Sequence, residues 1–184
     1  GKLPVTFPEK LKDIPAHSIG EYPEDGEGNV YYEEGIFVGY RHFDKNNVEP
    51  LFCFGHGLSY TQFDYSDIKA TKQNDHILVS ATIKNTGDRQ GKEVVQLYVK
   101  ALESKIPRPE KELKGFAKVD LKPGEDTTIE FKLKAEDFSY YSTEKEEWIV
   151  DPCEYELILG ASSRDLRLRE KINLGLFEEF CHGQ

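Results

Sequence analysis

The chain has 184 residues, of which 38% are hydrophobic, 32% charged and 12% aromatic. These proportions are those of a globular protein with a sizeable core, and they exclude disorder over the whole length. The 24 Lys and Arg against 34 Asp and Glu give a net charge of −10, which disfavours nucleic acid and anionic lipid as partners. No run approaches the roughly 18 apolar residues of a membrane span, and the first residues lack the apolar core of a signal peptide. We therefore expect no nucleic acid and no membrane as partners, and a cytoplasmic location is favoured.

The numbers of cysteine and methionine residues bear on the redox state of the protein's compartment and on whether the chain is a piece of a longer one. The three cysteines, Cys53, Cys153 and Cys181, are an odd number without a CxxC spacing. This pattern argues against a disulfide framework and favours a reducing compartment, although one pair can still form. The chain contains no Met, so either an initiator was removed before Gly1 or the chain is a piece of a longer one.

Residues 1–49 do not make a self-sufficient domain. Prolines at positions 4, 8, 15 and 23 interrupt any helix, and residues 24–29 (EDGEGN) are typical of an exposed loop. Residues 30–41 (VYYEEGIFVGYR) predict a strand or a buried turn with large apolar groups on both faces. Because this segment supplies nothing for the second face, we expect its packing partner to lie outside the chain.

Residues 50–64 form a connector between that segment and a region of alternating apolar residues. A free linker is rich in Gly, Ser or charge, whereas this stretch is rich in large apolar groups and is therefore expected to be packed. The side chains expected to be buried are Leu51, Phe52, Phe54, Leu58, Tyr60 and Phe63. Gly55 and Gly57 are expected to permit a tight turn or a close approach of two backbones.

Residues 65–174 have short apolar runs separated by turn signals, which predicts an immunoglobulin-like β-sandwich of seven or eight strands. Strands are expected at 77–83, 93–99, 113–121, 127–133, 138–141, 148–150, 155–160 and 166–172. The 93–99 strand has apolar residues on both faces, so we expect it at the centre of a sheet. Lys122-Pro123-Gly124-Glu125 predicts a type II turn through which the flanking strands pair. Residues 175–184 are too short a tail to assign.

Candidates for acid-base chemistry and metal binding are few. Glu33 and Glu34 adjoin, but neighbours on an extended strand point to opposite faces, so a solvated or structural role is expected. Cys53 and His56 have a CxxH spacing, yet two ligands do not make a zinc site, and a packed Cys with a hydrogen-bonded His is expected instead. The GHG of the connector lacks the third glycine, strand and helix of a dinucleotide site. We expect no catalytic, metal or cofactor residue in this chain.

Basic residues are candidates for contacts with other domains. Arg41, Arg108, Lys111 and Lys114 either meet acidic groups on another domain or form local ion pairs in and near an exposed loop, worth under about 1 kcal/mol each. Both possibilities are open.

An aromatic cluster is the candidate for sugar binding. Tyr140, Tyr141 and Trp148 can stack on sugar rings, although core packing is the expected use of Trp148. The charged turn around Trp148 contributes Glu146, Glu147 and Asp151, for which solvation is expected.

Five blocks of the sequence carry a resemblance to a known family. They are YYEEGIFVGYRHFD at 31–44, PLFCFGHGLSYTQFDYS at 50–66, NTGDRQGKEVVQLYV at 85–99, RPEKELKGFAKVDLKPGE at 108–125 and EYELILGASSRDL at 154–166. In this order they resemble the C-terminal part of family 3 glycoside hydrolases of the β-glucosidase type. Cys53 and Cys153 depart from the family pattern, which more often has Pro and Gly there.

The resemblance implies a mostly β fold, in which a fibronectin type III-like β-sandwich follows an incomplete terminal segment of an α/β sandwich domain. It implies that residues 1–49 end the α/β domain, with the catalytic aspartate in an N-terminal barrel and the acid/base glutamate upstream of the blocks. The chain alone is then expected to be inactive, with the barrel and α/β sandwich domains of its parent as partners. The alternatives are a non-catalytic carbohydrate-binding or docking module, served by the Tyr140, Tyr141 and Trp148 cluster, and oligomerisation through sheet edges.

Overall fold

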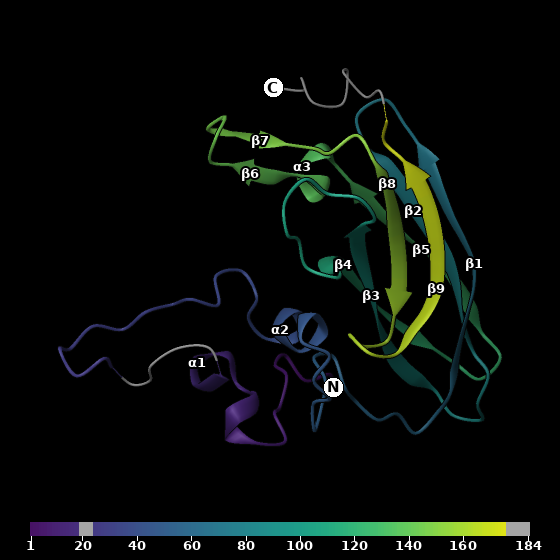
Figure 1. Cartoon of the computed structure of the whole chain (residues 1–184). Helices are drawn as coiled ribbons and strands as arrows, with labels where there is room; N and C mark the ends of the chain where they lie inside the picture. Colours follow the sequence, from purple (N-terminus) through teal and green to yellow (C-terminus); the bar gives the residue numbers. More distant parts are fainter. Residues whose placement is uncertain (19–23, 176–184) are drawn as a thin grey trace. The chain divides into compact units, whose positions relative to one another are not determined.

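A computed structural model describes residues 1–18 and 24–175, which divide into two units, each described here by itself (Figure 1). One unit, the N-terminal unit, comprises the described residues up to Leu58 together with Ser162–Arg164, and the other, the sandwich unit, begins at Ser59. The N-terminal unit has the short helices η1 (Leu11–Asp13), α1 (Pro15–Ser18) and α2 (Tyr40–Lys45). The sandwich unit has β1 (Phe63–Lys72), β2 (Ile77–Asn85), β3 (Gly91–Ala101), β4 (Glu112–Leu121), β5 (Asp126–Leu133), α3 (Ala135–Phe138), β6 (Tyr140–Ser142), β7 (Glu147–Ile149), β8 (Glu154–Gly160) and β9 (Leu166–Asn173).

Seven strands form the two sheets of a β-sandwich. The order is β1-β2-β5 in one sheet and β4-β3-β8-β9 in the other, and every pairing is antiparallel. This confirms the predicted mostly β fold of the immunoglobulin and fibronectin type III kind. The predicted central position of the 93–99 segment is also confirmed, because β3 lies between β4 and β8.

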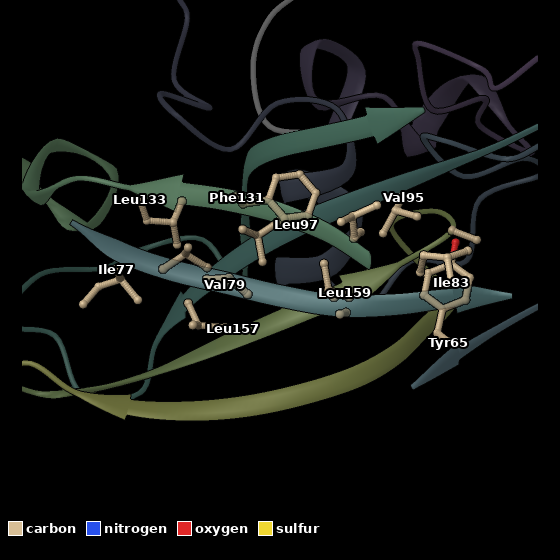
Figure 2. Packing of buried hydrophobic residues seen from close by; sticks show 14 of the residues in the cluster. Tyr65, Ile77, Val79, Ile83, Val95, Leu97, Phe131, Leu133, Leu157 and Leu159 are labelled. Atoms are coloured by element: carbon tan, nitrogen blue, oxygen red, sulfur yellow. The ribbon is translucent and has the colours of Figure 1, made fainter. Parts of the chain in front are cut away.

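The core lies between the inner faces of the two sheets (Figure 2). Along β2 the alternate residues Ile77, Val79, Ala81 and Ile83 are buried, as the period of two predicts. Ile77, Val79 and Ala81 are register partners of the apolar Leu133, Phe131 and Ile129 of β5. The opposite sheet supplies Val95, Leu97 and Val99 from β3 with Leu157 and Leu159 from β8. Each such side chain contributes roughly 1.5–3 kcal/mol when fully buried.

The partner predicted for the 113–121 strand is wrong. The turn itself has the expected geometry, since Glu125 N donates to Lys122 O at 3.0 Å and Gly124 has φ +77°. However, β4 pairs with β3 and β5 pairs with β2, so the turn carries the chain from one sheet to the other. A four-residue turn fixes the reversal of the chain but not which neighbour each strand pairs with.

Between β5 and β8 the chain leaves the two main sheets. Residues 135–138 form α3, so Phe138, the first residue of the strand expected at 138–141, instead ends a helix. Phe138 is fully buried against Tyr155, with ring centroids 5.1 Å apart. Strands β6 and β7 then pair only with each other, as a hairpin that extends away from the sheets (Figure 1).

In the N-terminal unit the first residues run antiparallel to the connector. Leu3 N donates to His56 O and Gly55 N to Leu3 O, both at 2.8 Å, and Phe7 bridges to Phe52. A Cβ at position 57 would lie 2.3 Å from the carbonyl oxygen of Gly1, and Gly55 has φ +80°. The predicted need for glycine at these positions is therefore confirmed.

Many large apolar side chains of residues 30–41 and of the connector are exposed within the described residues, as expected for segments whose packing partner lies outside the chain. Residues 30–41 form no strand but turns that lead into α2, and Tyr32 is 80% exposed. In the connector Phe54 is half-buried beside Tyr40, but Leu58 and Tyr60 are 89% and 92% exposed. The other large apolar residues left exposed in the N-terminal unit are Val5, Phe7, Leu11, Val30, Tyr31, Ile36, Val38, Leu51 and Phe52. Of the predicted tail, residues 176–184 with Cys181 lie outside the described residues.

Asn85 ties together four segments at one end of the sandwich. Its side-chain amide is fully buried and donates to Arg89 O at 2.7 Å and Leu121 O at 2.9 Å. Its Oδ1 accepts from Thr61 Oγ1 at 2.7 Å and from Gly87 N at 3.1 Å. The end of β2, the connector, the following loop and the end of β4 thus share one residue that uses its full hydrogen-bonding capacity.

We expect Asn85→Ala to lower the free energy of unfolding of the sandwich unit by about 2–4 kcal/mol, because it leaves buried carbonyls without donors. Urea unfolding followed by circular dichroism measures the loss. The exposed Asn74 is the matched control, and Asn74→Ala should change stability by less than about 0.5 kcal/mol. Equal effects of the two substitutions would contradict this role of Asn85.

Candidate functional site

The paired carboxylates of the N-terminal unit lie in a turn. Glu33 is exposed and Glu34 is half-buried, next to Gly35 with φ +55°. The premise that they occupy an extended strand is therefore wrong, because the chain turns at this point. Their expected solvated or structural role stays a prediction.

Cys53 and His56 face different partners. The Cys53 thiol donates to Ser162 Oγ at 3.4 Å, while the His56 ring packs on Phe52 with centroids 5.1 Å apart. Within residues 1–18 and 24–175, no group of three or more His, Cys, Asp or Glu side chains is arranged to hold a metal ion. None of the helices in those residues is long and apolar enough to cross a membrane.

Arg164 holds the end of α2 in the N-terminal unit. Its Nη2 donates to Val48 O at 3.0 Å and Phe43 O at 3.4 Å, and it lies 3.5 Å from the buried carboxylate of Asp44. Ser163 N donates to Phe54 O at 2.9 Å in the same segment. The ASSRDL block contains these residues, but their contacts are more than 100 positions away, so no local pattern indicates this role.

His42 is buried on α2, and Nδ1 of its ring lies 3.1 Å from Asn46 Nδ2. That amide also donates to His42 O at 3.1 Å, so the neutral ring with Nδ1 as acceptor fits this contact. Burial lowers the pKa of His42, and the nearby Lys45 adds to this effect, whereas Asp13 and Glu34 oppose it.

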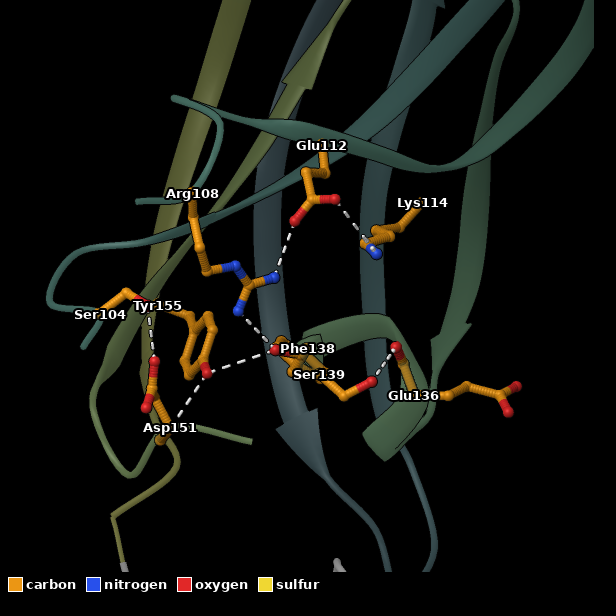
Figure 3. A network of polar contacts seen from close by, with 9 residues as sticks. All are labelled: Ser104, Arg108, Glu112, Lys114, Glu136, Phe138, Ser139, Asp151 and Tyr155. Carbon is orange, nitrogen blue, oxygen red and sulfur yellow. Dashed lines mark hydrogen bonds and ion pairs between the residues drawn. The ribbon is translucent and has the colours of Figure 1, made fainter. Parts of the chain in front are cut away.

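Arg108 and Glu112 form an ion pair inside the sandwich unit (Figure 3). Arg108 Nη2 lies 2.7 Å from Glu112 Oε2, and the two side chains are only 7% and 16% exposed. Arg108 Nη1 donates to Phe138 O at 2.7 Å, and Lys114 Nζ lies 3.9 Å from Glu112 Oε1. Of the two possibilities for these residues, local pairing is present for Arg108 and Lys114, but the pairs are buried instead of lying in an exposed loop.

Asp151 joins the same region from the segment before β8. Ser104 Oγ donates to its Oδ2 at 2.7 Å, and Tyr155 OH donates to its backbone oxygen at 3.0 Å. Tyr140 OH lies 3.5 Å from Asp151 Oδ1, and burial together with this carboxylate raises the pKa of Tyr140. Asp151 is buried, so its predicted solvation is wrong. The 102–111 loop, α3 and the base of the β6–β7 hairpin are thereby fastened to β8.

The aromatic cluster splits between the two faces of the β6–β7 hairpin. Tyr141 and Trp148 are direct cross-strand partners, with ring centroids 5.7 Å apart in a T-shaped arrangement. Tyr141 is 47% exposed and Trp148 70% exposed. Tyr140 points the other way, with the Arg108 guanidinium 5.9 Å from its ring centroid. Core packing of Trp148 is therefore wrong, because its hairpin lies outside the two layers that form the core.

Comparison with known proteins agrees with this architecture. Residues 93–163 match the fibronectin type III-like domain. The chain is 49% identical over 178 residues to thermostable β-glucosidase B of Acetivibrio thermocellus, covering 95% of this chain and 23% of that protein. β-Glucosidase BoGH3A of Bacteroides ovatus is 43% identical over 172 residues, with 91% and 23% covered.

Solved structures give the same relationship. β-Glucosidase 3B of Thermotoga neapolitana, in complex with α-D-glucose, superposes with a TM-score of 0.88 at 43% identity, covering 95% of this chain and 24% of that one. The GH3 β-glucosidase of Bifidobacterium adolescentis gives a TM-score of 0.89 at 39% identity, with 95% and 26% covered.

The class defined by these findings is a fibronectin type III-like sandwich, which in this chain follows the N-terminal unit. More particularly, the chain corresponds to the C-terminal part of family 3 β-glucosidases, which confirms the resemblance of the five sequence blocks. It spans about a quarter of the length of the relatives that it matches.

We expect Arg108→Met to cost about 3 kcal/mol in the free energy of unfolding, because the buried Glu112 carboxylate loses its 2.7 Å partner and its contact with Lys114 is longer. The double variant Arg108→Met, Glu112→Leu should recover part of this loss, since the buried carboxylate is then removed together with the guanidinium. Lys100, whose Nζ lies 2.6 Å from Glu110 Oε2 in a more exposed pair, is the control, and Lys100→Met should cost under about 1 kcal/mol. A loss for Arg108→Met no larger than the control would refute the buried pair.

His42 should make the N-terminal unit less stable in acid. Its folded pKa lies below the ordinary 6.5, so its contribution is complete above pH 6.5 and is lost as the pH falls below that value. The expected result is a lower opening free energy of the α2 amides at pH 5 than at pH 7, measured by hydrogen exchange corrected for intrinsic rates. His42→Gln, which stays neutral, should remove this difference, and a pH-independent wild type would contradict the assignment.

Proposed function

We propose that this chain is the C-terminal portion of a β-glucosidase-like enzyme whose parent hydrolyses terminal β-glycosidic bonds with retention. In this proposal the chain braces the catalytic domains and does not catalyse by itself. The observation that carries it is the match of 95% of the chain to 23% of a β-glucosidase at 49% identity. The proposed parts are the end of an α/β sandwich domain at 1–49, a connector at 50–64 and the fibronectin type III-like sandwich at 65–174.

The chemistry of the reaction supports a catalytic centre elsewhere in the parent. A retaining glycosidase needs a nucleophilic carboxylate and an acid/base carboxyl about 5–5.5 Å apart across the bond that is cleaved. The acid/base group also needs surroundings that raise its pKa, such as an apolar pocket. Glu33 is exposed in a turn beside the half-buried Glu34, and the two are neighbours in the chain. We therefore assign both catalytic groups to the part of the parent that precedes the five sequence blocks.

The exposed apolar side chains of the N-terminal unit support a covering partner. Tyr32, Ile36 and Val38 are exposed and follow one another at short intervals, and leaving such groups in water costs roughly 25 cal/mol per Å². The partner proposed is the remainder of the same parent, its barrel and its α/β sandwich domain. The carbohydrate substrate then reaches this chain only through the parent.

The test is to assay the chain on an aryl β-glucoside, alone and mixed with the Acetivibrio thermocellus enzyme from which the matching C-terminal region has been deleted. We expect no turnover by the chain alone and restored turnover in the mixture, because the chain supplies the missing brace. In the mixture, Glu33→Gln and Glu34→Gln should each keep turnover within about tenfold of wild type, since neither is assigned to the chemistry. Turnover by the chain alone that either substitution abolishes would overturn the proposal.

A further inference from the structure

The β6–β7 hairpin presents its two exposed aromatic rings on one face. Tyr141 and Trp148 lie opposite each other in the strand register, and their T-shaped contact leaves ring surface open to solvent. Trp148 is the only Trp of the chain. A ring of this size exposed at 70% is costly unless it is covered by something else part of the time.

The Tyr141 and Trp148 rings form a platform, and contacts on the opposite face of the hairpin hold it in place. A two-stranded hairpin alone is marginally stable in water. Here Tyr140, on the opposite face, approaches Asp151 and lies beside Arg108, while Asp151 and Arg108 are bonded to Ser104, Phe138 and Glu112. A ligand that binds the Tyr141 and Trp148 face therefore does not have to order the hairpin first. This removes the entropic cost of ordering from the free energy of binding.

The negative charge of the hairpin turn disfavours anionic ligands. The turn at 143–147 contains three glutamates and one lysine, so its local charge is −2, and the whole chain carries −10. An anionic polysaccharide, a nucleic acid or an acidic lipid surface is repelled there. An aromatic face on a hairpin with a negatively charged turn suits a neutral ligand that is apolar on its flat side.

We propose that Tyr141 and Trp148 form a stacking platform for the pyranose rings of a neutral β-linked glucan. In β-glucopyranose all substituents are equatorial, so both ring faces present C–H groups to an aromatic surface. This site goes beyond the bracing role and does not depend on it, because it lies entirely within the sandwich unit.

The experiment titrates the full chain with cellohexaose and follows the fluorescence of Trp148. Stacking should shift the emission to the blue and saturate in the millimolar range, while polygalacturonate and dextran should give no shift. Tyr141→Ala keeps the fluorophore and should weaken binding roughly tenfold, as loss of one aromatic contact predicts. Phe116→Ala, which removes another exposed ring of the same unit, is the matched control and should bind as the wild type does.

A second measurement protects the result against a misfolded variant. Retardation of the chain in a native gel containing soluble β-glucan should be lost in Trp148→Ala, whose circular dichroism should remain that of the wild type. No spectral shift and no retardation would overturn the proposal, as would unchanged binding by Tyr141→Ala. The Trp148 emission could also shift on addition of the C-terminally deleted Acetivibrio thermocellus enzyme and not on addition of glucan. That result would make the hairpin a protein-docking surface and would overturn the proposed glucan site. None of these outcomes requires catalysis, so they are distinguishable from a failure of the proposed bracing role.

Discussion

The structure of the sandwich unit depends on one apolar layer enclosed between two twisted sheets. Alternate residues of β2 and β5 meet those of β3 and β8, and a slip of one residue in any strand would turn its apolar set to solvent. This constraint fixes register and leaves little freedom in the four main strands. The β6–β7 hairpin, which pairs with neither sheet, contributes no residue to this layer.

The strands that line this layer are also the part that the sequence predicts well. Ile77, Val79, Ala81 and Ile83 alternate with polar residues, and this period alone locates β2 and its inner face. The partner of β4 was not predictable in the same way, because Pro123-Gly124 specifies a reversal equally well in a hairpin and in a passage between sheets. Pairing depends on contacts that are distant in sequence.

Side-chain surroundings of the candidate residues were harder to predict for the same reason. Trp148 reads as a core residue because it lies in an apolar strand, but its strand belongs to a hairpin outside the layers. Asp151 reads as solvated and Arg108 as part of an exposed loop, yet backbone and side-chain partners up to 47 positions away bury them. The turn at Glu33 and Glu34 was hard to predict for another reason. Residues 30–41 have an apolar pattern, but the described residues provide no surface that covers it and selects its conformation.

The two polar networks lie at opposite ends of the apolar layer. Asn85 stands where β2 and β4 end and β5 is about to begin, whereas the Arg108 and Asp151 group stands where β4 and β8 begin. At each end of the sandwich, some backbone groups lie past the last hydrogen bond between neighbouring strands. A buried carbonyl without a donor lowers the free energy of unfolding by about 1–3 kcal/mol. The Asn85 end therefore fastens Thr61 of the connector, and the Arg108 end fastens the β6–β7 hairpin. The sandwich unit thus holds the connector at one end and, at the other, the β6–β7 hairpin, which lies outside its two sheets.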